Sequence, residues 1–86
     1  MHTVELLEES LSVVKRLGYR IRHEWLNGTG GGGCEIAGQK WFFLDLALGP
    51  GDQLEQVLET LRREPAAGRM ALSIPLGEMV GLRRSA

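Results

Sequence analysis

The residues that could carry chemistry gather around a glycine-rich segment, residues 27–33, which leads into the only cysteine of the chain. Gly28, Gly30 and Gly33 match the glycine spacing of dinucleotide-binding loops. In those folds the loop opens a helix whose N-terminus holds the pyrophosphate, whereas a strand is predicted to follow here. Four consecutive glycines also satisfy almost any spacing. The segment therefore favours either a connection with positive φ or the close approach of another backbone, and no cofactor is predicted.

Cys34 is a candidate nucleophile because it lies beside these glycine N–H groups. A thiol becomes reactive only with a base or a positive field within hydrogen-bond reach. His23 is the only histidine in the body of the chain. If residues 19–26 pair antiparallel with residues 34–37, His23 lies about 10 Å along the strand from the residue opposite Cys34. We therefore expect no catalytic dyad, and packing roles for both side chains.

Asp45 interrupts the apolar run at residues 41–48. Burial of an ionised carboxylate is costly unless it is paired or hydrogen-bonded. We therefore expect Asp45 to cap the following loop or to pair with an arginine such as Arg20 or Arg22. One cysteine, two histidines and scattered carboxylates offer no zinc spacing, so no metal site is predicted.

Two helices are predicted to position these residues. Apolar residues at steps of three and four indicate a helix over residues 3–17, with Thr3 as N-cap and Gly18 at the left-handed position after its end. A second apolar stripe indicates a helix over residues 50–63. Pro50 suits its first turn, and Pro65 prevents its continuation.

Strands are predicted between the helices. Residues 19–26 alternate between two faces, and residues 34–37 and 40–46 flank Gly38-Gln39, which suits a two-residue hairpin turn. That turn places Ile36 opposite Trp41. The run at residues 41–44 is apolar on both faces, which is typical of a central strand covered on each side.

Residues 69–74 alternate well enough for a fourth strand, which Pro75 confines to an edge. Beyond it, Gly77 and Gly81 argue against a helix, and an irregular tail is expected. We therefore divide the chain into one domain, residues 1–75, and a tail, residues 76–86. The fold class is α+β, a two-layer sandwich of order α-β-β-β-α-β with two helices on a mainly antiparallel sheet.

Composition excludes several classes of protein. The chain has 86 residues, 43% of them hydrophobic, and a net charge of −1, which together indicate one small globular domain and argue against disorder. No apolar run approaches the roughly 20 residues of a membrane span. The acidic N-terminus does not resemble a signal peptide, and a lone cysteine fits a reducing cytoplasm. The C-terminal arginines stand in a slightly acidic chain, which argues against nucleic acid as a partner.

A chain this short buries a thin core, so apolar surface left over favours association. The apolar residues concentrate toward the carboxyl end. We therefore predict a cytoplasmic protein-interaction domain without catalysis of its own, which binds another protein or forms a homodimer. The predicted interface comprises Met70, Leu72, Ile74, Leu76 and Met79. The alternative is a small-ligand or regulatory domain whose site comprises Gly30, Gly31, Gly32, Gly33, Cys34, His23 and Asp45.

Overall fold

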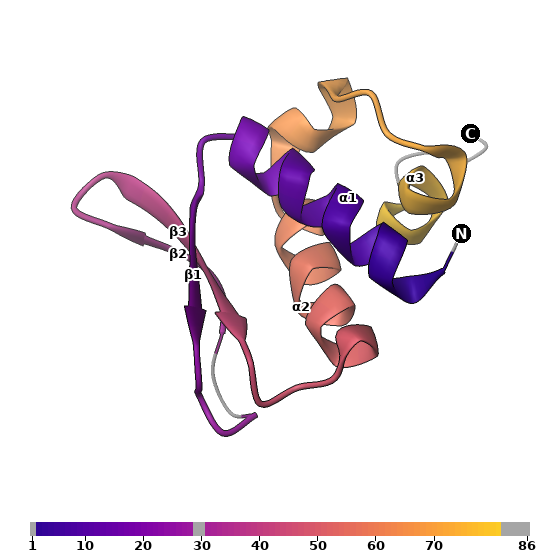
Figure 1. The fold of residues 1–86 in the computed structure, drawn as a ribbon. Helices are drawn as coiled ribbons and strands as arrows, with labels where there is room; N and C mark the ends of the chain where they lie inside the picture. The colour runs from indigo at the N-terminus through magenta and orange to yellow at the C-terminus, as the bar shows by residue number, and fades with distance from the viewer. Residues whose placement is uncertain (1, 29–30, 82–86) are drawn as a thin grey trace.

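The computed structural model describes residues 2–28 and 31–81, which form a layer of helices on a small sheet (Figure 1). The α+β class predicted from the sequence is confirmed, although the number and order of elements differ. In chain order the elements are α1 (Thr3–Arg16), β1 (Arg20–Glu24), β2 (Gly32–Ile36), β3 (Gln39–Asp45), α2 (Pro50–Arg62), the 3₁₀ helix η1 (Pro65–Arg69) and α3 (Ile74–Val80).

The two long helices form where the sequence predicts them, because their signals are local. In α1 the N-cap is His2 rather than Thr3, and the Glu5 carboxylate accepts a hydrogen bond from the His2 N–H at 3.1 Å. The chain leaves α1 through Gly18, whose φ is +100°, in a conformation that side chains disfavour. Pro50 begins α2 at the first helical turn. The two helices pack against each other and bury the apolar stripe of each.

The sheet is mixed, which corrects the prediction of a mainly antiparallel one. The strand order is β1-β3-β2, with β1 parallel and β2 antiparallel to β3. Residues 19–26 and 34–37 are therefore not neighbours, because β3 lies between them. The most apolar strand thus takes the central position and is hydrogen-bonded along both edges.

The β2–β3 hairpin closes with Ala37 and Gly38, one position earlier than predicted. Their φ angles are +52° and +81°, which is the signature of a two-residue type I′ turn. Ile36 consequently lies opposite Gln39 rather than Trp41, and Cys34 lies opposite Trp41. The register has moved by two residues, so every side chain keeps the face that the alternation predicts.

The α-helices of the described residues, α1, α2 and α3, lie on one side of the sheet (Figure 1). On that side Phe42 and Leu44 of β3 are buried in the core. The alternate residues of the same strand, Trp41 and Phe43, face the other way and are only half-buried. No described helix covers them, so the prediction of a central strand covered on both faces is wrong.

Residues 69–74 do not form the fourth strand that the sequence predicts. The 3₁₀ helix η1 ends at Arg69, and after an extended link α3 begins at Ile74. Ser73 is the N-cap of α3: its hydroxyl accepts the Leu76 N–H at 3.3 Å. Glu9 of α1 holds Ser73 in place by accepting from its N–H at 2.8 Å and from its hydroxyl at 2.6 Å.

Pro75 therefore marks the first turn of a helix rather than the end of a strand. Residues 76–80, predicted as irregular, belong to α3, which ends at Gly81 with a φ of +82°. Residues 82–86 of the predicted tail lie outside the described residues. In the described part of the chain no helix has the length and apolar character needed to cross a membrane.

Candidate functional site

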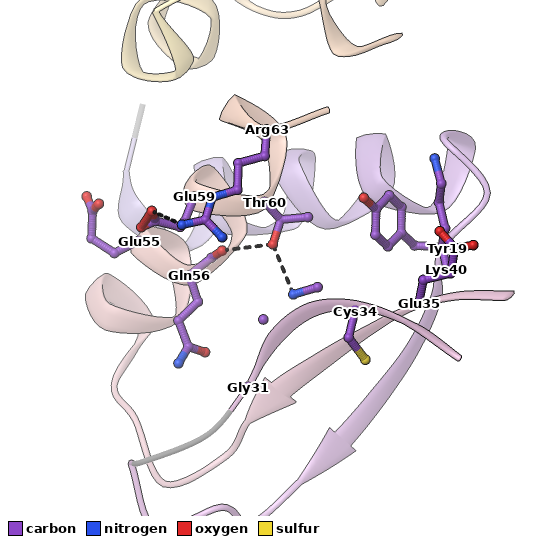
Figure 2. A pocket seen from close by; sticks show the side chains of 12 residues that line it. Tyr19, Gly31, Cys34, Glu35, Lys40, Glu55, Gln56, Glu59, Thr60 and Arg63 are labelled. Atoms are coloured by element: carbon purple, nitrogen blue, oxygen red, sulfur yellow. Dashed lines mark hydrogen bonds and ion pairs between the residues drawn. The ribbon is translucent and has the colours of Figure 1, made fainter. Parts of the chain in front are cut away.

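A groove of about 580 Å³ runs between β2 and α2 (Figure 2). We call it the strand–helix groove. Backbone of the glycine-rich segment lines one side, and polar side chains of α2 line the other. Its lining residues are Tyr19, Gly31, Gly32, Gly33, Cys34, Glu35, Lys40, Glu55, Gln56, Glu59, Thr60 and Arg63.

The glycines allow α2 to approach β2 closely. A Cβ atom on Gly33 would lie 2.9 Å from Thr60 Cγ2, a distance that real Cβ atoms do not adopt. The Gly33 N–H instead donates to Thr60 Oγ1 at 3.2 Å. A Cβ atom on Gly31, whose φ is +105°, would lie 2.9 Å from the Phe43 carbonyl oxygen. The positive φ expected from the sequence is therefore present at Gly31. The close neighbours of both glycines are this chain's own helix and central strand, and the approach of a partner's backbone stays a prediction.

An ion-pair network closes one end of the groove. Glu64 accepts hydrogen bonds from Lys40 Nζ at 2.8 Å and from the Tyr19 hydroxyl at 3.1 Å. The bond from Lys40 is the main reason that the pKa of Glu64 is below its usual value, and the same bond raises the pKa of Lys40. Burial, with help from Glu64, raises the pKa of Tyr19. The network links the residue before β1, strand β3 and the N-cap of η1.

Carboxylates dominate the remaining lining. Arg63 Nη2 lies 3.3 Å from Glu59 Oε1, and Glu55 lies 3.6 Å from Arg62. These pairs are exposed to solvent. Glu35 forms no ion pair with any described residue.

The structure does not bring the three predicted polar residues together. Cys34 contributes to the groove, but its sulfur points away from Thr60 and Arg63 (Figure 2). Paired residues share a face, so Cys34 opposite Trp41 and His23 beside Leu44 lie on opposite faces of the sheet. Neither His23 nor Asp45 lines the groove. Of the predicted glycines, Gly30 lies outside the described residues.

Asp45 is fully buried at the end of β3 and holds the loop that follows β1. Its Oδ1 accepts the N–H of Leu26 at 3.0 Å and that of Ala47 at 2.9 Å. Burial by itself raises the pKa of Asp45, but the bonds from Ala47, Leu26 and Gly28 outweigh it and hold the pKa below its usual value. Asp45 therefore holds backbone N–H groups, which is the capping role expected from the sequence, and it pairs with no arginine among the described residues.

A second surface lies on the uncovered side of the sheet, and we call it the open sheet face. Trp41 and Phe43 stack there with ring centroids 6.1 Å apart. Arg20 lies over the Trp41 ring at 5.8 Å. The register places on this face Arg20, Arg22 and Glu24 of β1, Cys34 and Ile36 of β2, and Trp41 and Phe43 of β3. Sequence reasoning missed this surface, because an apolar run on both faces of a strand indicates burial on both.

The predicted carboxyl-terminal interface is divided between core and surface. Leu76 is fully buried, and Met70 and Leu72 pack against the core. Ile74 is 62% exposed and Met79 is 36% exposed. Three of the five predicted interface residues therefore pack in or against the core of the same chain.

In the described ranges no three His, Cys, Asp or Glu side chains are grouped closely enough to hold a metal ion. Comparison of the chain with protein families, with curated proteins and with solved structures finds no match.

Proposed function

We propose that this chain is a small protein-interaction domain, without catalysis of its own, that forms a homodimer through the open sheet face. A cytoplasmic location, in which the exposed thiol of Cys34 stays reduced, belongs to the same proposal. The observation that carries it is the stacked pair Trp41 and Phe43, which alternates along β3 with the buried residues Phe42 and Leu44 and so lies on the face away from the core.

The chemistry of the open sheet face suits a second copy of the same surface. Its centre is apolar, and Ile36 beside it is 53% exposed. Charges lie at its border: Arg22 pairs with Glu24 at 2.9 Å. A two-fold axis through the aromatic pair allows each copy to present carboxylate to the other copy's arginine. The net charge of −1 gives two copies little repulsion.

This proposal moves the interface away from the carboxyl end. Leu76, at the centre of the surface predicted from the sequence, is inside the core. Ile74 and Met79 remain exposed, and both lie on α3. The open sheet face has the larger side chains, and aromatic residues are enriched where proteins associate.

Sedimentation equilibrium at micromolar concentration tests the proposal with a matched pair of variants. Trp41→Ser removes an aromatic side chain from the open sheet face, whereas Trp25→Ser removes one that is 72% exposed and lies after β1. We expect the wild type and Trp25→Ser to sediment as dimers and Trp41→Ser as a monomer. A monomeric wild type, or dissociation by Trp25→Ser alone, would overturn the proposal.

The single thiol provides an independent measurement. Cys34 lies on the open sheet face and is exposed in the monomer. Its alkylation rate should fall as protein concentration rises through the dimerisation range, and it should not change with concentration in Trp41→Ser. A rate independent of concentration in a dimeric wild type would place the interface elsewhere.

The sequence-based alternative, a small-ligand site that includes His23 and Asp45, has no observation in its favour. Neither residue reaches the groove that Gly31, Gly32 and Gly33 line.

A further inference from the structure

We propose that the outer edge of β1, together with Trp25 that follows it, binds an extended segment of a partner protein as an added antiparallel strand. The segment carries apolar residues on the face that it shares with Ile21 and a carboxylate opposite Arg20. The site uses the backbone edge of β1, so it does not depend on dimerisation through the open sheet face.

The first argument is the hydrogen-bonding state of β1. The Glu24 C=O accepts the Leu46 N–H at 2.8 Å, so the backbone polar groups of Glu24 point toward β3. These groups alternate in direction along a strand, so the N–H and C=O of Ile21 and His23 point away from β3. No described residue forms a hydrogen bond with these outward groups. Such an edge accepts another strand.

The second argument is that this edge is open. β3 is the only described element that packs closely along β1. The register between the two strands has no bulge and β1 contains no proline, so neither of these usual obstacles is present. The outer edge of β2 differs, because Thr60 of α2 accepts the Gly33 N–H there. Of the two outer strands, β1 therefore offers the unoccupied edge.

The third argument is Trp25, which directly follows β1 and is 72% exposed. The backbone is fixed on both sides of it. Before it, the Glu24 C=O accepts the Leu46 N–H. After it, the Leu26 N–H donates to the buried carboxylate of Asp45 at 3.0 Å. The indole is thus presented to solvent from anchored backbone, and tryptophan is enriched among the residues that contribute most to binding.

Charge and packing indicate the chemistry of the added strand. Arg20 forms no ion pair with any described residue, whereas Arg22 and Glu24 neutralise each other at 2.9 Å. A carboxylate opposite Arg20 therefore adds a cross-strand ion pair. On the other face Ile21 packs against the core, so an apolar residue opposite it extends that core. Antiparallel addition is favoured because it is the slightly more stable pairing per residue.

The test uses the Trp41→Ser chain, in which Trp25 is the only tryptophan and dimerisation does not contribute. The probe is the capped peptide acetyl-Val-Thr-Val-Thr-Val-Glu-amide, titrated to millimolar concentration while the fluorescence of Trp25 is followed. We expect a saturable shift of the emission to shorter wavelength and protection from quenching by acrylamide, because the added strand covers the indole. The absence of a saturable change would overturn the proposal. The same shift on raising the protein concentration without peptide would also overturn it, since the occupant would then be a second copy.

Two matched changes measure the contribution of charge. Lysine in place of the peptide glutamate puts a cation opposite Arg20 and should weaken binding about 2- to 5-fold. Arg20→Gln should weaken binding of the glutamate peptide by a similar factor and abolish the preference between the two peptides. Arg69→Gln, at an exposed residue of η1, is the control and should leave binding unchanged. Equal affinity of the two peptides for the chain with Arg20 would overturn the proposal.

His23→Pro tests the backbone edge. Proline is tolerated in an edge strand where the N–H faces solvent, so this variant removes one donor and keeps the pairing of β1 with β3. It should bind the peptide about 2- to 10-fold more weakly than His23→Ala, which removes the imidazole and keeps the N–H. If His23→Pro fails to fold, a peptide methylated at the nitrogens that face β1 removes hydrogen bonds of the added strand from the other side. Unchanged affinity of that peptide would overturn strand addition.

Discussion

Both faces of the sheet carry aromatic residues, but those on one face are buried in the core and those on the other are partly exposed. On the helix side Phe42 is completely buried in a core that three helices share. On the open side its neighbours in sequence, Trp41 and Phe43, stack on each other and remain half-buried. A single strand thus supplies both the centre of the core and the most aromatic surface of the chain. Hydrophobicity alone does not distinguish the two roles, whereas the position of the helices does.

The difference between the two faces is tested most directly by truncating two adjacent phenylalanines, one on each face. Phe42→Ala should lower the free energy of unfolding by about 3–5 kcal/mol, because it leaves a cavity in the core. Phe43→Ala should cost only about 1 kcal/mol in the monomer, because the ring is already partly in water. Urea unfolding in the monomeric Trp41→Ser background measures both. Similar losses would mean that the open sheet face is covered after all.

The carboxyl end offers a second pair of positions. Leu76 is fully buried, so Leu76→Ala should lower the free energy of unfolding by about 2–5 kcal/mol. Ile74 is 62% exposed, and Ile74→Ala should change it by less than about 0.5 kcal/mol. Urea midpoints of the two variants compare them directly. A large effect of Ile74→Ala would mean that Ile74 is covered, and the carboxyl end would again be a candidate interface.

Gly33 tests the close approach of α2 to β2. Gly33→Ala should lower the free energy of unfolding by about 1–3 kcal/mol, since the added methyl group meets Thr60 Cγ2. Thr60→Ser removes that methyl group and keeps the hydroxyl that accepts the Gly33 N–H. In a double-mutant cycle, Thr60→Ser should therefore recover part of the loss. Strictly additive effects would contradict the contact.

Acid should lower the stability of the fold mainly through two carboxylates. One is Glu64, which is hydrogen-bonded to Lys40 and Tyr19, and the other is the buried Asp45. The pKa values of Asp45 and Glu64 are lowered in the folded chain, below the unfolded values of 3.8 and 4.5. Each therefore stabilises the fold above its unfolded value, and this contribution is lost as the pH falls through the folded pKa. Urea midpoints should decline below about pH 5, where these carboxylates begin to protonate in the unfolded chain.

Glu64→Gln separates this effect from general acid unfolding. The variant should be less stable at neutral pH and should show a shallower decline toward acid, since one titrating group is gone. The pKa of Lys40, the main partner of Glu64, is raised in the folded chain. The stability that protonated Lys40 contributes is therefore complete below its unfolded pKa and is lost as the pH rises through its folded pKa. An acid slope identical to that of the wild type would contradict the network.

The elements that the sequence predicts correctly are those with local signals. Helix α1 has an apolar stripe that ends at Gly18, and α2 begins at Pro50, so neither depends on distant partners. The hairpin is located by Gly38, although the positive φ of Ala37 moves its turn by one residue. The parallel pairing of β1 with β3 has no local signal, because it joins strands separated by a long connection.

The carboxyl end and the groove show where local signals are ambiguous. Pro75 can end a strand or begin a helix, and it is Ser73 at the N-cap position that favours the helix. The glycine run indicates close approach, but only the tertiary structure identifies Thr60 as the neighbour. Asp45 is predicted as structural because its burial has to be compensated, and its backbone partners follow from the loop geometry.

The strand order has a consequence for the path by which the chain folds. β2 and β3 are joined by two residues, so they can meet on the microsecond timescale of hairpin formation. β1 and β3 are separated in sequence by β2, so their pairing is a non-local contact. Closing such a contact carries a larger entropic cost. We expect the hairpin to form early and β1 to dock late, so that transient detachment of β1 frees one edge of the central strand while the hairpin stays intact.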